Sequence, residues 1–220
     1  MSAASSQTPP RGGYPVEAFA RIAAVENGNY WFESRNRLIA WAIQRYFPEA
    51  RTFLDVGCGT GYVLAGLATA CPQLKLAGAD FMDEGLEFAR RRVPSATFVK
   101  MDAQRLDIPE PADVAGSFDV LEHIEEDVSV MKRLREVIRP GGGLLIAVPQ
   151  HRWLWSSADA QAQHVRRYTR REMVTKLESA GFEVLRVTSF ISVLLPLMAL
   201  SRWRDARKTR GPSASELHVS

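Results

Sequence analysis

The stretch "FLDVGCGTGYVLAGL" (residues 53–67) places three glycines between an apolar run and a helical pattern. These glycines are spaced as G-x-G-x-G, at Gly57, Gly59 and Gly61. A phosphate-binding P-loop requires a Lys-Ser/Thr pair after its last glycine, whereas a Tyr-Val pair follows here. A dinucleotide-binding loop requires its third glycine at position 62, which is Tyr62. The spacing therefore argues against both phosphate loops, and an acid, Asp55, stands two residues before the first glycine.

Short apolar runs alternate with helical patterns from Phe53 onward, which is typical of βαβ units. We predict strands at Thr52–Val56, Lys75–Ala79, Thr97–Met101, Asp113–Phe118, Leu144–Val148 and Glu183–Ser189. Helices are predicted at about 61–70, 82–91, 126–137 and 171–180, and at 30–47 ahead of the first strand. Proline or glycine marks the joints, as in "RPGGG" at 139–143. The pattern predicts an α/β fold, a Rossmann-like doubly wound, mostly parallel sheet with helices on both faces.

The glycine stretch with its preceding acid resembles motif I of the class I S-adenosylmethionine (SAM)-dependent methyltransferases, D/E-x-G-x-G-x-G. SAM carries a cationic sulfonium and an ammonium group rather than a phosphate, so an acid at the strand end favours its binding by charge. Glycines allow a tight turn and a close approach to the ligand. The resemblance implies that Asp55, Gly57, Gly59 and Gly61 bind SAM, with S-adenosylhomocysteine (SAH) as the product.

Further acids stand just past the next two predicted strands, where open α/β sheets bind their ligands. Asp80 lies 19 residues after Gly61, where an acid accepts hydrogen bonds from both ribose hydroxyls. Phe81 and Met82 follow it and are expected to pack on the adenine. The resemblance places Asp102, with its neighbour Ala103, at the adenine amino group.

The fourth predicted strand runs into "GSFDVLEHIEED" (116–127), and this stretch also resembles small-molecule methyltransferases. The resemblance implies that Phe118 and Asp119 border the transferred methyl group. Base N-methyltransferases usually carry an Asn/Asp-Pro-Pro-aromatic loop here, and cytosine C5 enzymes carry a nucleophilic cysteine after a proline. This chain has neither, so we expect a small-molecule acceptor and no nucleic acid.

The segment "PQHRWLWSSADAQAQHVRRYTRREM" (149–173) is long and aromatic for a strand-to-helix joint. Long ordered insertions are often functional, and we expect a lid over the acceptor at 150–170. Trp155, Arg167 and Tyr168 are predicted to bind the acceptor. His164 and His123 are the candidate general bases, with His164 favoured for work on the acceptor. No metal site is predicted.

At the amino-terminal side, "NYWFESRNRLI" (29–39) resembles the family's opening helix, and Arg35 is expected to reach the methionine carboxylate of the cofactor. The composition fits one globular domain. We predict a poorly ordered leader at 1–28, a methyltransferase domain at 29–200 and a basic flexible tail at 201–220. Two cysteines without a secretory signal indicate a reducing compartment, here the cytoplasm.

The carboxyl-terminal region departs from the family pattern. The class I sheet normally ends with an antiparallel seventh strand, and no convincing strand pattern follows residue 189. The apolar and basic stretch at 190–210 leaves peripheral membrane contact open, although no stretch is long enough to span a bilayer. The oligomeric state stays open.

The sequence therefore predicts a SAM-dependent methyltransferase acting on a small molecule, with O-, N- or C-methylation unresolved. One alternative is a non-catalytic SAM-binding subunit, which the missing strand favours. A second is an RNA methyltransferase, favoured by a pI near 9.0 and disfavoured by the fourth-strand loop. A nicotinamide-dependent oxidoreductase ranks lowest, because Tyr62 replaces the third glycine.

Overall fold

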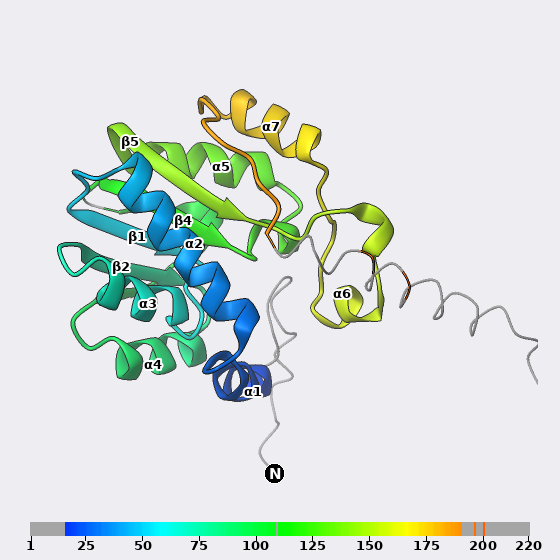
Figure 1. Cartoon of the computed structure of the whole chain (residues 1–220), viewed down its shortest axis with the longest axis horizontal. Coiled ribbons are helices and arrows are strands. Elements are labelled where there is room, and N and C mark those ends of the chain that lie inside the picture. The colour runs from blue at the N-terminus through cyan, green and yellow to red at the C-terminus, as the bar shows by residue number, and fades with distance from the viewer. Residues whose placement is uncertain (1–15, 109, 191–195, 197–199, 201–220) are drawn as a thin grey trace, which may run out of the picture.

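The computed structural model describes residues 16–108, 110–190, 196 and 200. Its centre is a five-stranded parallel sheet in the order β3-β2-β1-β4-β5 (Figure 1). The strands are β1 Thr52–Val56, β2 Lys75–Asp80, β3 Thr97–Lys100, β4 Ala112–Phe118 and β5 Ile138–Ala147. This order, with crossovers on both sides of β1, confirms the predicted Rossmann-like α/β class.

The register brings the carboxyl ends of the strands to one edge of the sheet. Asp55 on β1 lies opposite Gly78 on β2 and Gly116 on β4, and all three pairings of the central strands are parallel. Since ligands bind beyond this edge in open α/β sheets, the loops after β1, β2 and β4 meet at one place.

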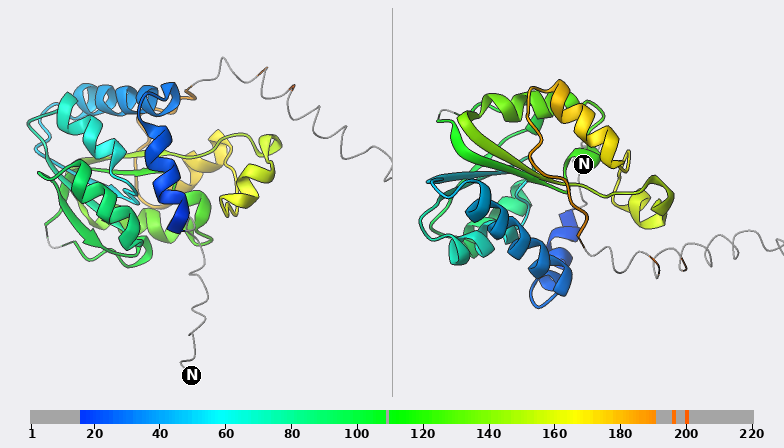
Figure 2. Two further views of the ribbon diagram at one scale, coloured as in Figure 1. Left: turned by 90° about the horizontal axis from the view of Figure 1, so that it is seen from below. Right: turned by 45° about the horizontal axis from the view of Figure 1, so that its top comes forward.

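Helices cover both faces of the sheet (Figure 2). Side chains alternate along a strand, so Phe53 packs in the core cluster on one face and Leu54 in the cluster on the other. The first cluster takes apolar residues from α2 (Tyr30–Tyr46), α3 (Tyr62–Ala70) and α4 (Asp83–Arg92). The second takes them from α5 (Asp127–Glu136) and α7 (Arg170–Ser179).

Two predicted strand assignments are wrong. Residues 183–189 form no strand, and side-chain contacts hold this segment instead: Ser189 Oγ donates to Gln150 Oε1 at 2.5 Å. An alternating pattern of apolar residues favours an extended segment, but a strand also needs a neighbouring strand to share backbone hydrogen bonds with, and the pattern cannot supply one. The "RPGGG" stretch belongs to β5 rather than to the joint before it, with a register shift opposite Ala112–Val114 and Gly141 at φ 81°. No seventh strand occurs among the described residues.

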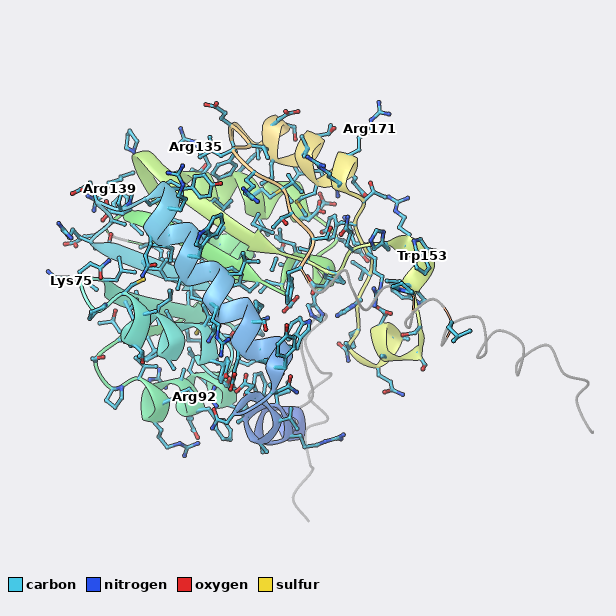
Figure 3. The ribbon with its side chains drawn as sticks, in the orientation of Figure 1. Lys75, Arg92, Arg135, Arg139, Trp153 and Arg171 are labelled. Atoms are coloured by element: carbon cyan, nitrogen blue, oxygen red, sulfur yellow. The ribbon has the colours of Figure 1, made fainter. Side chains whose placement is uncertain are left out.

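The predicted poorly ordered leader is wrong for Val16–Glu26, which form helix α1. A buried network anchors this helix: Thr60 Oγ1 donates to Glu26 Oε1 at 2.6 Å, and Arg92 Nη1 donates to Glu26 Oε2 at 2.6 Å. Glu26 is only 3% exposed, and Arg92 lies on α4 beside α1 (Figure 3). The partners come from the glycine loop and from α4, so the short sequence of α1 alone did not reveal its anchoring.

The tail at 201–220 and most of the stretch at 190–210 lie outside the described residues. Within the part that the structure describes, no helix combines the length and apolar character required to cross a membrane.

Candidate functional site

The three positions in the loop after β1 require glycine for different structural reasons. All three have positive φ angles, of 83°, 49° and 74°. A Cβ on Gly57 would lie 2.2 Å from Val120 Cγ2, and one on Gly61 would lie 2.9 Å from Ala89 Cβ. A Cβ on Gly59 would meet no atom within 4 Å. Gly57 and Gly61 therefore allow close packing inside the protein, while Gly59 faces the cavity.

The backbone amides of this loop bond within the protein. Gly57 and Cys58 both donate to Ala79 O, at 2.8 and 3.1 Å, and Gly59 donates to Asp80 Oδ2 at 2.8 Å. A phosphate loop presents such amides to its ligand. These amides are already used, which agrees with a ligand whose main requirement is space and a nearby negative charge.

Asp55 supplies that negative charge beneath the loop. It is 1% exposed, and its Oδ1 has no hydrogen-bond partner among the described residues. Burial raises the pKa of Asp55 to about 7, against the opposing effect of Arg35, and Asp80 raises it further. A cationic ligand beside this carboxyl would favour its ionised form.

Asp80 organises the turn between β2 and α4. Its two carboxylate oxygens accept hydrogen bonds from the Gly59 and Met82 amides, both at 2.8 Å. Burial raises the pKa of Asp80, and these backbone hydrogen bonds oppose the shift. Asp80 thus ties the glycine loop to the second strand and lines the cavity beside it.

We expect Asp80→Ala to weaken SAH binding tenfold or more, measured by calorimetry. Two charge-assisted hydrogen bonds to the ribose, at about 1.5–3 kcal/mol each, are the source of the loss. Asp83→Ala is the matched control, because Asp83 is an exposed acid whose partner is Lys100. Asp80→Asn, which keeps one acceptor oxygen, should lie between wild type and alanine. Unchanged affinity in Asp80→Ala would remove this residue from the site.

The remaining predicted adenine-side residues all line the same cavity. Phe81 is 44% exposed, so its ring is open to a ligand. Asp102 caps the short helix η1 (Ala103–Arg105) by accepting a hydrogen bond from the Gln104 amide at 2.8 Å. Met82 and Ala103 stand beside these residues on the wall. The structure therefore brings this predicted group together.

A cavity of about 1970 Å³ extends from the glycine loop past β4 to the segment after β5. Phe118 and Asp119 lie on its wall between the two ends. Asp119 has a φ of 57°, an uncommon backbone angle for a residue other than glycine. Strained backbone of this kind occurs often at functional sites. The volume and lining of the cavity leave room for a cofactor beside the glycine loop and a second molecule beside the segment after β5.

Arg35 reaches this middle region from α2. Its Nη1 forms an ion pair with Asp119, and its guanidinium carbon lies 4.8 Å from the centre of the Trp31 ring. The Nε atom is buried and has no hydrogen-bond partner among the described residues. Arg35 therefore keeps a donor for the methionine carboxylate of the cofactor, the partner predicted from the sequence. In this structure its ion-pair partner is Asp119.

Both candidate general bases lie at the far end of the cavity. The rings of His123 and His164 have centroids 4.8 Å apart. Burial and the neighbouring His164 lower the pKa of His123 to about 4, against a hydrogen bond to the Gln163 backbone. Sequence reasoning missed Glu122, which lies beside them at 0% exposure. Burial and the charge of Asp119 raise the pKa of Glu122 well above its usual value.

A second missed residue, Asp159, holds the loop after β5 together from helix α6 (Ser157–Gln161). Its carboxylate lies 3.0 Å from His164 Nδ1 and accepts from Arg167 Nε at 2.7 Å. Burial alone would raise the pKa of Asp159, but the hydrogen bonds from Arg167 and His164 outweigh burial and lower this pKa to about 2. Arg167 is thus bound inside the protein, where the sequence predicted an acceptor contact.

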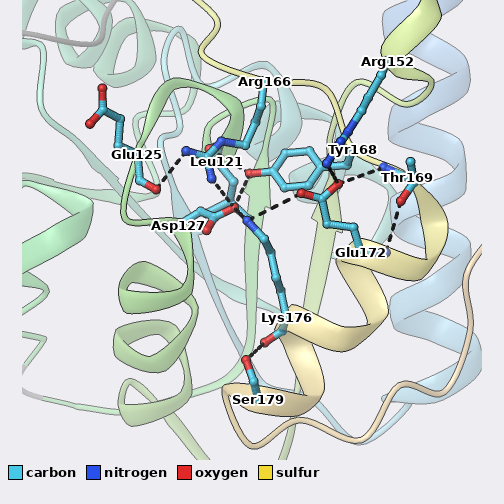
Figure 4. Close-up of polar contacts among 10 residues, drawn as sticks. All are labelled: Leu121, Glu125, Asp127, Arg152, Arg166, Tyr168, Thr169, Glu172, Lys176 and Ser179. Carbon is cyan, nitrogen blue, oxygen red and sulfur yellow. Dashed lines mark hydrogen bonds and ion pairs between the residues drawn. The ribbon is translucent and has the colours of Figure 1, made fainter.

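Tyr168 is also a core residue rather than an open acceptor contact. It is 1% exposed, and its hydroxyl lies 2.7 Å from Asp127 Oδ2 and 3.0 Å from Leu121 O (Figure 4). Burial and the neighbouring Asp127 raise the pKa of this hydroxyl. Lys176 Nζ completes the group at 2.5 Å from Asp127 (Figure 4). The network fixes α7 and the end of the loop to α5.

We expect Tyr168→Phe to lower the free energy of unfolding by about 1–2 kcal/mol, because Asp127 loses a buried hydrogen-bond donor. Chemical denaturation measures the change. Tyr46→Phe is the matched control. The hydrogen bond that the Tyr46 hydroxyl accepts from exposed Arg186 is long, at 3.5 Å, so its loss should change the stability little. A Tyr168→Phe variant as stable as wild type, with altered acceptor binding, would return Tyr168 to the acceptor site.

The loop itself is closed at its base. Tyr168 N donates to Pro149 O at 2.9 Å, and His151 N donates to Tyr168 O at 3.0 Å. Trp155, predicted to bind the acceptor, is 42% exposed and does not line the cavity. Trp153 likewise lies at the outer side of this segment (Figure 3). Leu154, between them in sequence, is the buried residue of the turn, whereas the two tryptophans are 56% and 42% exposed.

Comparison with known proteins agrees with this geometry. A family model described as a methyltransferase domain matches residues 29–187. A probable S-adenosylmethionine-dependent methyltransferase of Mycolicibacterium smegmatis is 27% identical over 173 residues, covering 77% of this chain and 66% of the relative. A trans-aconitate 2-methyltransferase of Afipia carboxidovorans is 32% identical over 103 residues, covering 47% of this chain and 40% of the relative.

Solved structures share the fold. Phosphoethanolamine N-methyltransferase 2 of Haemonchus contortus, in complex with S-adenosyl-L-methionine, superposes with a TM-score of 0.68 at 20% identity. The match covers 90% of this chain and 48% of that chain. This likeness shows the fold alone, because the identity is low.

The chain belongs to the methyltransferase-domain family that its residues 29–187 match. The resemblance to class I SAM-dependent methyltransferases is thereby confirmed, and so is SAM as the cofactor of the family. The chain spans 66% of the length of the first curated relative and 40% of the second.

Proposed function

We propose that this protein binds SAM beside Gly59 and transfers its methyl group to a small molecule held at the other end of the cavity. The observation that carries the proposal is the position of Gly59. Its missing side chain leaves open space next to the buried carboxyl of Asp55 and the half-buried carboxyl of Asp80. A cationic ligand without phosphate fits this combination of room and negative charge.

In the proposed reaction, the acceptor attacks the methyl carbon in line with the carbon–sulfur bond. The bond electrons remain on sulfur, which becomes the neutral thioether of SAH. The protein therefore contributes mainly by holding the two reactants close and aligned. Phe118 and Asp119, midway along the cavity wall, are the residues proposed to border the methyl group.

An acceptor that is a hydroxyl must also lose a proton. His164 is the proposed base, because Asp159 orients its ring through Nδ1 and so leaves Nε2 directed toward Glu122 and the cavity. A carbon or amine acceptor places smaller demands on a base. The site residues are compatible with a hydroxyl, an amine or a carbon acceptor.

Support for a small-molecule acceptor comes from the wall and from the relatives. The wall at the acceptor end is built from residues that follow β4 and from the closed loop after β5, and the sequence after β4 is not of the kind that binds a flipped base. The relatives named above include enzymes for trans-aconitate and, by fold, for phosphoethanolamine. We propose the cytoplasm as its location on the sequence grounds given above.

The test has two stages. Calorimetry with SAH should show one site per chain, and incubation with methyl-labelled SAM and a panel of small acids, amines and phenols should transfer label to an acceptor. Binding without transfer to any panel member would favour the non-catalytic alternative. Loss of all binding at modest salt, with transfer to RNA, would favour the RNA alternative.

A further inference from the structure

Three potential metal ligands meet at the acceptor end of the cavity. One ligand atom from each of Glu122, His123 and His164 lies within 4.8 Å of the others. Two of these residues come from helix η2 (Leu121–His123) directly after β4, and the third comes from the loop after β5. We propose that Glu122, His123 and His164 bind a divalent transition-metal cation, with Zn²⁺ and Co²⁺ as the matching chemical type.

The carboxylate of Glu122 is the strongest reason. It is 0% exposed, and neither of its oxygens has a hydrogen-bond partner in another described residue. A buried carboxylate without a partner is costly, so such groups are usually paired or coordinate a metal. A ring nitrogen of His123 and one of His164 each lie within 4.8 Å of the Glu122 carboxylate, and imidazoles are metal ligands in their neutral form.

His164 is arranged as metal-binding histidines usually are. Its Nδ1 lies 3.0 Å from Asp159 Oδ1, and its Nε2 lies 3.9 Å from Glu122 Oε1. Metal-bound histidines commonly donate one ring N–H to a carboxylate, which fixes the ring and directs the other nitrogen at the ion. Arg167 and the Ser156 amide hold Asp159 in turn.

His123 completes the set. It is hydrogen-bonded to the Gln163 backbone, and a neutral imidazole that donates one N–H keeps a lone pair on its other nitrogen. Ligand atoms around a tetrahedral zinc ion lie about 3.3 Å apart, given bonds of about 2.0–2.1 Å. Side-chain rotations that move these atoms by about 1 Å would therefore close the site.

The number of ligands suggests how the site serves the protein. Three protein ligands leave a coordination position open, as in catalytic rather than structural zinc sites. On the proposed function, that position would hold an oxygen of the acceptor next to the methyl group. With a cation bound, His164 Nε2 would be a ligand and could not accept a proton, and the cation would itself favour loss of the proton from an acceptor hydroxyl. This role rests on the proposed methyl transfer, whereas the site itself does not. The proposed metal site departs from the sequence analysis, which predicts none.

The experiment uses the full chain without an affinity tag, freed of metal with a chelator and dialysed. Titration with ZnCl₂ by calorimetry, and with CoCl₂ by visible absorption, should show one equivalent bound per chain. Glu122→Gln and His164→Ala should each weaken binding at least tenfold. His151→Ala is the matched control, because His151 lies on the same loop outside the cluster and should bind as wild type does.

Glu122→Gln also separates a metal role from a structural one. It removes a buried carboxylate without partners, so the metal-free variant should unfold at or above the wild-type temperature. SAH affinity, measured on the same samples, should be unchanged. Wild-type protein that takes up no equivalent overturns the proposal, as does a Glu122→Gln variant that binds both cations normally. Metal binding without SAH binding would instead count against the proposed function.

Discussion

His164→Ala should lower the rate of methyl transfer by about 10²- to 10⁴-fold, the range expected when a general base is removed. The ring is 13% exposed at its side chain, faces the cavity and is oriented by Asp159. The loss is expected in turnover and not in cofactor binding, because His164 belongs to the loop after β5 whereas Gly59 belongs to the loop after β1. Turnover with a found acceptor and SAH affinity by calorimetry are measured on the same preparation.

Gln161→Ala is the control for this variant. Gln161 belongs to the same loop, is exposed and does not line the cavity, so both quantities should match wild type. A His164→Ala protein with full turnover would make the histidine structural. If SAH binding weakened while transfer stayed normal, the loop would belong to the cofactor side of the cavity.

Gly59→Val should reduce SAH affinity by about 100-fold or more while the protein still folds. The added branches would occupy space that meets no protein atom within 4 Å and that we assign to the cofactor. The φ of 49° adds backbone strain, which costs on the order of 1–2 kcal/mol for a residue with a Cβ. Calorimetry gives the affinity, and circular dichroism with thermal unfolding gives the fold.

Gly28→Val is the control that separates the effect of backbone strain from the effect of filling the proposed cofactor site. Gly28 has a φ of 73°, and a Cβ there also meets nothing within 4 Å, but it does not line the cavity. This control should lose similar stability and keep SAH affinity. If Gly59→Val alone failed to fold, the glycine would be needed chiefly for the backbone, and normal SAH binding would place the cofactor elsewhere.

The parts of the fold that sequence reasoning predicted are those encoded locally. The strand at Thr52–Val56 was predicted to the residue, because a short apolar run ends at a glycine turn. The acids at the carboxyl ends of β1, β2 and β3 were predicted from the family resemblance together with the rule that parallel strands deliver their carboxyl ends to one edge. Asp55, Asp80 and Asp102 all line the resulting cavity.

The acceptor end was less predictable, because its partners are far apart in sequence. Tyr168 and Asp127 are 41 positions apart, and nothing local to either shows that they bond. Asp159 and Arg167 are 8 apart, but they pair only because α6 turns the chain back. Glu122 was overlooked beside His123 because exposed glutamates are common, and its burial is visible only in three dimensions.

The anchoring of α1 has a consequence for how the protein behaves in different media. At physiological ionic strength, salt screens exposed charges beyond about 8 Å and affects buried pairs much less. The Lys100–Asp83 pair, with both side chains more than half exposed, belongs to the first kind. The pair of Glu26 and Arg92, at 5% and 18% side-chain exposure, belongs to the second. The contact between the first helix and the glycine loop is therefore expected to depend much less on salt concentration than the Lys100–Asp83 pair does.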